Sequence, residues 1–103
     1  MEFNYMSPEG KILTSVRVNN LTKRVTIKNH TDNIYDCAFG VKSKVTYDDV
    51  MEFLEDRTFP RNRADIADIL NVLNLKKYDA YLMCKKLGGR TEQDNNWIDF
   101  LED

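Results

Sequence analysis

Five carboxylates gather in one short stretch of the chain, directly before three arginines. They lie in the segment DDVMEFLEDRTFPRNR. Paired carboxylates can act as general acid and base in hydrolysis. Carboxylates on one helix face can instead meet a basic protein groove, and arginines in a turn can contact phosphates. The acids are Asp48, Asp49, Glu52, Glu55 and Asp56, and the arginines are Arg57, Arg61 and Arg63.

The other residues that could do chemistry form no catalytic pattern. His30 is the single histidine, so a nucleophile or a metal site would depend on this one imidazole. Cys37 and Cys84 form no CxxC pair, which predicts reduced, partly buried thiols. Gly88 and Gly89 lack the pattern of a phosphate-binding loop. We therefore expect no cofactor, no metal and no enzymatic activity, and a small carboxylate-dependent hydrolase is the last of the alternatives.

Length and charge define the class of protein. The chain has 103 residues, 42% of them hydrophobic, and we expect one domain spanning residues 1–103. The net charge of -2 argues against a general nucleic-acid coat. Residues 1–45 hold seven basic against four acidic residues, whereas residues 46–103 hold eight against thirteen. With no signal segment and no apolar run of membrane length, the expected location is cytoplasmic.

Residues 1–45 are expected to form the β-rich half of an α+β fold. Apolar and polar residues alternate, and turn-forming residues punctuate the alternation at residues 7–10 and 19–20. This pattern predicts a small antiparallel sheet with one solvated face. Gly40 is the weak point of the last strand. The expected strands cover residues 3–5, 12–18, 24–28 and 37–41.

Residues 46–103 change to the period of helices. Thr46 with Asp49 is a capping-box pattern that predicts the start of one helix, and Asn62 with Asp65 repeats the pattern before another. The strongest helical signal is an apolar stripe with helical spacing that follows the second cap. The stripe consists of Ile66, Ile69, Leu70 and Leu73.

A third helix and a short terminal strand complete the expected fold. The third helix is predicted to begin near Tyr78 and to stop at Gly88, with Lys85 and Lys86 at its negative end. Residues 97–100 are expected either to add a short strand or to pack down as a tail. The two to three helices are expected to cover one face of the sheet.

Residues 57–63, which we call the elbow, join the first two expected helices. Pro60 pushes Phe59 out of the helical region, so the first helix must end near Thr58. We expect this bend to expose the three arginines while Phe59 fills the helix junction. The arrangement is similar to a helix-turn-helix, but Asp65 and Asp68 at the start of the second helix would repel phosphates. DNA reading is therefore the less favoured interpretation.

The elbow and its flanks also carry a partial family resemblance. The residues concerned are Leu54, Arg57, Phe59, Pro60, Arg63, Asp65, Ile66, Cys84, Asp94, Trp97 and Ile98. In order and spacing they resemble a segment of small Firmicute and phage proteins described as HipA-like, over residues 45–100. The loop from Cys84 to Asp94 looks longer here, and Phe53-Leu54 replaces a more aromatic pair. The resemblance implies a phage or mobile-element origin and a compact accessory module, without the kinase of the family's larger neighbouring region.

The elbow also has a structural interpretation. Arg57 and Arg63 are expected to bridge to Asp94 and to cap carbonyls, because the planar guanidinium suits carboxylates and buried turns. Such bridges would lock the elbow against the tail that carries Trp97.

The sequence favours a non-catalytic interaction protein of a phage or mobile element. In size and charge only, the chain resembles small acidic phage proteins that block nucleic-acid-guided nucleases (anti-CRISPR proteins). The five acids would occupy a basic groove of a host protein in a bacterial cell, and exposed aromatic residues would anchor the complex. The alternative is a DNA-binding regulator or toxin-antitoxin accessory module that uses the three elbow arginines.

Overall fold

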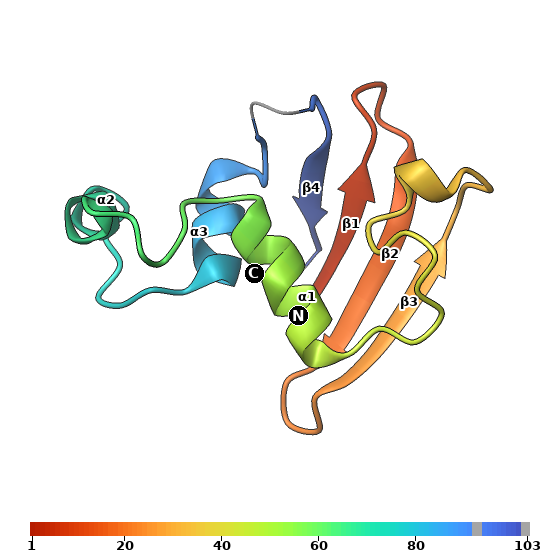
Figure 1. The fold of residues 1–103 in the computed structure, drawn as a ribbon, viewed down its shortest axis with the longest axis horizontal. Coiled ribbons are helices and arrows are strands. Elements are labelled where there is room, and N and C mark those ends of the chain that lie inside the picture. Colours follow the sequence, from red (N-terminus) through yellow and green to blue (C-terminus); the bar gives the residue numbers. More distant parts are fainter. Residues whose placement is uncertain (92–93, 102–103) are drawn as a thin grey trace.

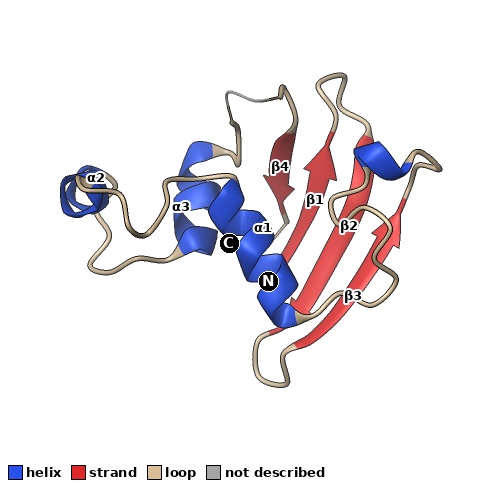
Figure 2. Ribbon diagram, viewed as in Figure 1, coloured by secondary structure: helices blue, strands red, loops and turns tan. Residues whose placement is uncertain are grey.

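A four-stranded antiparallel sheet with two helices on one face forms the body of the molecule (Figures 1 and 2). The computed structural model describes residues 1–91 and 94–101. The strand order is β3-β2-β1-β4, and the predicted α+β class is confirmed. The elements are β1 (Glu2–Met6), β2 (Ile12–Asn19), β3 (Arg24–Asn29), the 3-10 turn η1 (Ile34–Asp36), α1 (Tyr47–Asp56), α2 (Ile66–Val72), α3 (Ala80–Leu87) and β4 (Trp97–Phe100).

Alternation of apolar residues gives β1, β2 and β3 a common buried face. The register places Phe3 opposite Val16 and Val16 opposite Ile27, so the three side chains lie in one row across the sheet. Phe3 and Val16 are almost completely buried, at 0% and 1% exposure. Lys23 adopts a positive φ of 60° in the turn between β2 and β3. Both predicted hairpins are confirmed.

The fourth strand comes from the end of the chain. In β4, Ile98 pairs with Tyr5 and Phe100 pairs with Phe3, which confirms the short terminal strand. The prediction of a strand at residues 37–41 is wrong, because this segment forms turns and Gly40 has a φ of +58° that no extended strand allows. The sheet therefore combines strands from both halves of the chain.

Helices α1 and α3 pack on the apolar face of the sheet. The predicted capping box of α1 is present, with Thr46 and Asp49 bonding to each other's backbone N–H. Val50 and Leu54 of α1 are fully buried. Helix α3 ends, as predicted, at Gly88, which adopts a φ of +78° in the left-handed region.

Helix α2 lies on an arm that projects away from the sheet (Figure 1). The prediction that Asn62 caps this helix is wrong: α2 begins at Ile66, and its N-cap residue Asp65 makes no capping bond with its side chain. None of its residues is buried, and Val72 is 85% exposed. Helices α1 and α3 therefore cover the sheet, within the expected two to three, and α2 lies outside this layer (Figure 1).

Candidate interaction surfaces

Arg57 directs its side chain into the molecule at the end of α1. It is only 7% exposed, so the expectation that the elbow presents Arg57 to a partner is wrong. The guanidinium donates to the Gly89 carbonyl at 2.6 Å and to both oxygens of Asp94 at 3.0 and 3.2 Å. It also donates to the Asn96 carbonyl at 3.0 Å. The expected Arg57–Asp94 bridge is confirmed, and it fixes α1 to the connection between α3 and β4.

Gly89 makes this bridge sterically feasible. Its φ is +64°, and a Cβ at this position would lie 2.6 Å from Cδ1 of Ile98. Any other residue would therefore displace Ile98, which is buried in the core. Hydrogen bonds from Arg57 lower the pKa of Asp94, so the carboxylate is charged at neutral pH. Gly89 thus allows the chain to pass close to Ile98 at this point.

The two cysteines are free thiols that face the protein interior to different degrees. Cys84 is fully buried in α3 and donates from Sγ to the Leu54 carbonyl at 3.2 Å. Burial raises the pKa of Cys84 to about 12, so its thiol is protonated at neutral pH. Cys37 is half-buried, and its Sγ lies 3.6 Å from the Asn33 carbonyl.

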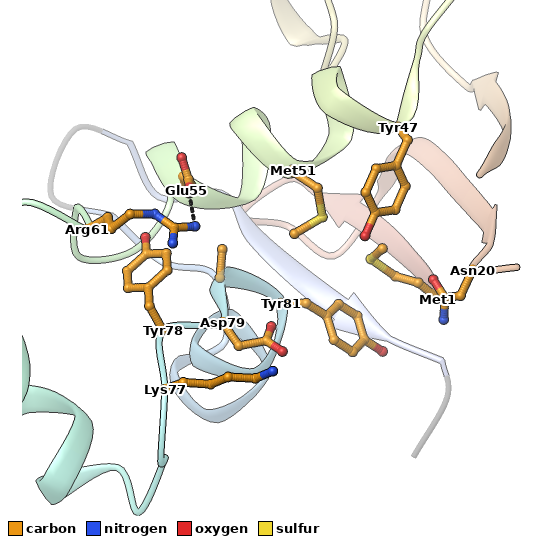
Figure 3. Close-up of a pocket in the computed structure, with 11 residues that line it drawn as sticks. Met1, Asn20, Tyr47, Met51, Glu55, Arg61, Lys77, Tyr78, Asp79 and Tyr81 are labelled. Atoms are coloured by element: carbon orange, nitrogen blue, oxygen red, sulfur yellow. Dashed lines mark hydrogen bonds and ion pairs between the residues drawn. The ribbon is translucent and has the colours of Figure 1, made fainter.

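The other two elbow arginines pair with nearby carboxylates. Arg61 donates to Glu55 at 3.3 Å and stacks over the ring of Tyr78 at 4.4 Å (Figure 3). Arg63 donates to Asp65 at 2.6 Å instead of bridging to Asp94, so that part of the structural interpretation is wrong. The bond from Arg63 lowers the pKa of Asp65. Each elbow arginine is thus engaged by a carboxylate of the chain itself.

Phe59, Pro60 and Trp97 all lie outside the centre of the core. Phe59 is half-buried, lies 5.1 Å from the Arg63 guanidinium and accepts a hydrogen bond from Tyr78 through its carbonyl. Pro60 is exposed in the turn. Trp97 is half-buried and donates from Nε1 to the Ser7 carbonyl at 3.0 Å.

The five acids of α1 separate into two groups. Asp49 accepts a 2.7 Å hydrogen bond from Lys42, which together with the Thr46 backbone lowers the pKa of Asp49 to about 2. Glu55 pairs with Arg61. Asp48, Glu52 and Asp56 recur every four residues along one helix face and are exposed. Within residues 1–91 and 94–101, these three form no ion pair.

Apolar side chains border the exposed acids. A shallow hollow of about 430 Å³ lies between α1 and the segment before it, and Glu52 and Asp56 form part of its wall. Phe39 and Phe53 line it with their rings 5.3 Å apart, and Val41 beside them is 78% exposed. The sequence analysis did not identify Phe39 and Val41 as contact residues. The available signal was their apolar character in a predicted strand whose pairing with a neighbouring strand was not clear.

A second cleft lies between α1, α3 and the start of the chain (Figure 3). Its volume is about 470 Å³, and its walls include Tyr47, Tyr78 and Tyr81. Both carboxylates in its lining are engaged: Glu55 pairs with Arg61, and Asp79 accepts the first-turn N–H of Leu82. The cleft therefore presents aromatic surface rather than a free acid–base pair.

His30 has a local polar partner, since its Nε2 lies 2.9 Å from the Ser15 hydroxyl. Among the residues that the structure describes, no three histidine, cysteine, aspartate or glutamate side chains gather as a metal site. None of the helices in the described ranges is sufficiently long and apolar to span a membrane.

Comparisons of the chain with protein-family models, with curated proteins and with solved structures found no match.

Proposed function

We propose that the chain is a non-catalytic interaction protein that binds a basic, nucleic-acid-handling surface of another protein. The contact surface, which we call the α1 face, consists of Asp48, Glu52 and Asp56 together with Phe39 and Val41. Its carboxylates attract a groove rich in lysine and arginine and compete there with phosphates. The exposed Val41 and the half-buried Phe39 next to them supply apolar area that desolvates on contact.

The observation that carries this proposal is the contrast between the engaged arginines and the unpaired acids. Arg57 is buried, and Arg61 and Arg63 each bond to a carboxylate. Asp48, Glu52 and Asp56 lie exposed on one side of a well-capped helix. The helix thus offers negative charge at fixed spacing, whereas the elbow offers little free positive charge.

The same contrast weakens the nucleic-acid alternative. A DNA reader would need arginines that are free to reach phosphates and bases. In addition, Asp65 and Asp68 stand at the start of α2 and would repel phosphates. A bacterial host protein with a guide-RNA or target-DNA groove, such as a nucleic-acid-guided nuclease, fits the α1 face better, and a phage-encoded inhibitor would need no bond-making chemistry to block it.

The test is a triple substitution, Asp48→Asn with Glu52→Gln and Asp56→Asn, in the full chain. Wild-type protein immobilised on a resin and exposed to bacterial lysate should retain a stoichiometric partner. Added single-stranded RNA or DNA should release that partner, because both compete for the same basic groove. The triple variant should retain less than about one tenth as much partner, because three charge pairs are lost.

The matched control removes the same number of charges elsewhere, with Asp32→Asn, Asp36→Asn and Asp68→Asn. All three residues are exposed, and they lie outside α1. This control should retain the partner as wild type does. Equal loss in both triple variants, or absence of a stoichiometric partner, would contradict the proposal. Salt-sensitive DNA retention that disappears with Arg61→Gln and Arg63→Gln would favour the DNA-binding alternative instead.

A further inference from the structure

Strand β3 is a free edge of the sheet, because it pairs with β2 on one side only. The His30 N–H donates to the Leu13 carbonyl, which makes this pair a hydrogen-bonded one. Since hydrogen-bonded pairs alternate along an antiparallel ladder, residues 24, 26 and 28 direct their main-chain groups toward β2. The main-chain N–H and C=O groups of Val25 and Ile27 therefore point away from the sheet. An exposed row of this kind is a template for another strand.

A groove runs along this edge on the helix side of the sheet. Its volume is about 590 Å³. One wall is β3 with the turn before it, and the other is the segment Ser43–Tyr47 that leads into α1 and crosses in front of β3 (Figure 1). Val25 and Ile27 are half-buried along the floor, and Val45 is 8% exposed. The floor is thus apolar and has room for further side chains.

The charged residues that line the groove are all basic. Lys23, Arg24 and Lys44 line it, and the residues that line it include no acid. Lys28 adds another exposed cation to β3 on the opposite face of the sheet. A second copy of the chain docking β3 against β3 would bring like charges together, which disfavours that occupant.

We propose that β3 and this groove bind an extended acidic segment of another protein by strand addition. The added strand would bond to the outward main-chain groups of Val25 and Ile27. Its side chains would alternate between the two faces of the sheet. One set, apolar and β-branched, would enter the groove, and the other set, Asp or Glu, would lie opposite Arg24 and Lys28. This surface is distinct from the α1 face and opposite to it in charge.

The test begins with a display library of random eight-residue peptides selected on the immobilised full chain. Enriched peptides should alternate Val or Ile with Asp or Glu. When such a peptide is added to the free chain, hydrogen exchange at the amides of Val25 and Ile27 should slow by at least about tenfold, because the peptide accepts hydrogen bonds from them. The amides of Thr26 and Lys28, which already bond to β2, should change much less.

Two variants separate strand addition from simple charge attraction. Val25→Pro removes an outward N–H without removing a bond to β2, which an edge strand tolerates. Lys28→Glu reverses an exposed charge that lies opposite the acidic set and leaves the main chain unchanged. Each should weaken peptide binding, measured by fluorescence anisotropy, at least about tenfold. Lys11→Glu, the same charge change in the exposed β1–β2 turn, should leave binding within about twofold.

Several outcomes would overturn the proposal. They are failure of the library to yield acidic alternating peptides, exchange rates of Val25 and Ile27 that do not respond to peptide, and equal effects of Lys11→Glu and Lys28→Glu. Self-association of the chain that protects the same two amides would assign the edge to a second copy and overturn it as well. Loss of partner binding at the α1 face has no bearing on these readouts, so the two proposals fail separately.

Discussion

At the scale of the residue, Arg57 is the side chain whose removal should do the most damage outside the apolar core. Arg57→Met leaves the Gly89 and Asn96 carbonyls without their donor and Asp94 without its cation. We expect a loss of about 2–4 kcal/mol in the free energy of unfolding, measured by urea titration. Arg61→Met, the same substitution at an exposed ion pair of the elbow, should cost less than about 1 kcal/mol. Similar losses in the free energy of unfolding for both variants would show that the buried bridge stabilises the fold no more than an exposed ion pair does.

Asp94 makes this bridge sensitive to pH. Hydrogen bonds from Arg57 lower its pKa in the folded protein below the ordinary value of 3.8. A depressed folded-state pKa adds stability above the unfolded-state pKa, and this contribution disappears as pH falls through the folded-state value. Wild type should therefore exceed Asp94→Asn in stability at pH 6, and the difference should shrink steadily in urea titrations below pH 4. A difference that is independent of pH would contradict this assignment.

At the scale of the element, α2 should behave differently from α1 although both have apolar stripes. A seven-residue helix without buried residues has little tertiary support, and isolated short helices are unstable in water. Its amides should exchange hydrogen quickly, while those of α1 exchange near the global unfolding rate. Leu70→Ala in α2 should cost less than about 1 kcal/mol, whereas Leu54→Ala in α1 should cost about 2–5 kcal/mol in urea titrations. Comparable costs would mean that the arm packs as firmly as the core helices.

Local sequence patterns predicted those elements whose signals do not depend on distant contacts. Alternation of apolar and polar residues predicted β1 to β3. The Thr46 capping box correctly predicted where α1 begins, and Gly88 correctly predicted where α3 ends. Where an element packs is a non-local property, so the strong stripe of α2 did not reveal that it lies on an arm. The inward turn of Arg57 depends on carbonyls more than 30 residues away in the chain. The Arg57–Asp94 pair was predicted because arginine and carboxylate are chemically matched, but the sequence did not decide between this buried role and an exposed one.

At the scale of the whole molecule, charge follows the layers of the fold. Exposed lysines and arginines lie along β3, and the acids of α1 that form no ion pair with a described residue lie on the layer above the sheet. The excess of basic residues in residues 1–45 and of acidic residues in residues 46–103 thus becomes two surfaces of opposite charge. On the two proposals above, each surface repels the partner proposed for the other, so opposite charge would separate the two specificities.

The same layout predicts which parts of the chain the fold requires. A chain that ends before Asp94 loses the acceptors of Arg57 on Asp94 and Asn96, and also Ile98 and Phe100, which pack in or against the core. We expect it to lose the cooperative thermal transition in circular dichroism, because the core is opened along β1. Replacing residues 62–76 by a short Gly/Ser linker should preserve this transition, because the Tyr78 hydroxyl bonds to the Phe59 carbonyl at 2.8 Å and already holds the two ends of the arm together. A cooperative transition in the shortened chain would show that folding does not require β4. Loss of the transition in the variant without the arm would show that folding requires residues 62–76.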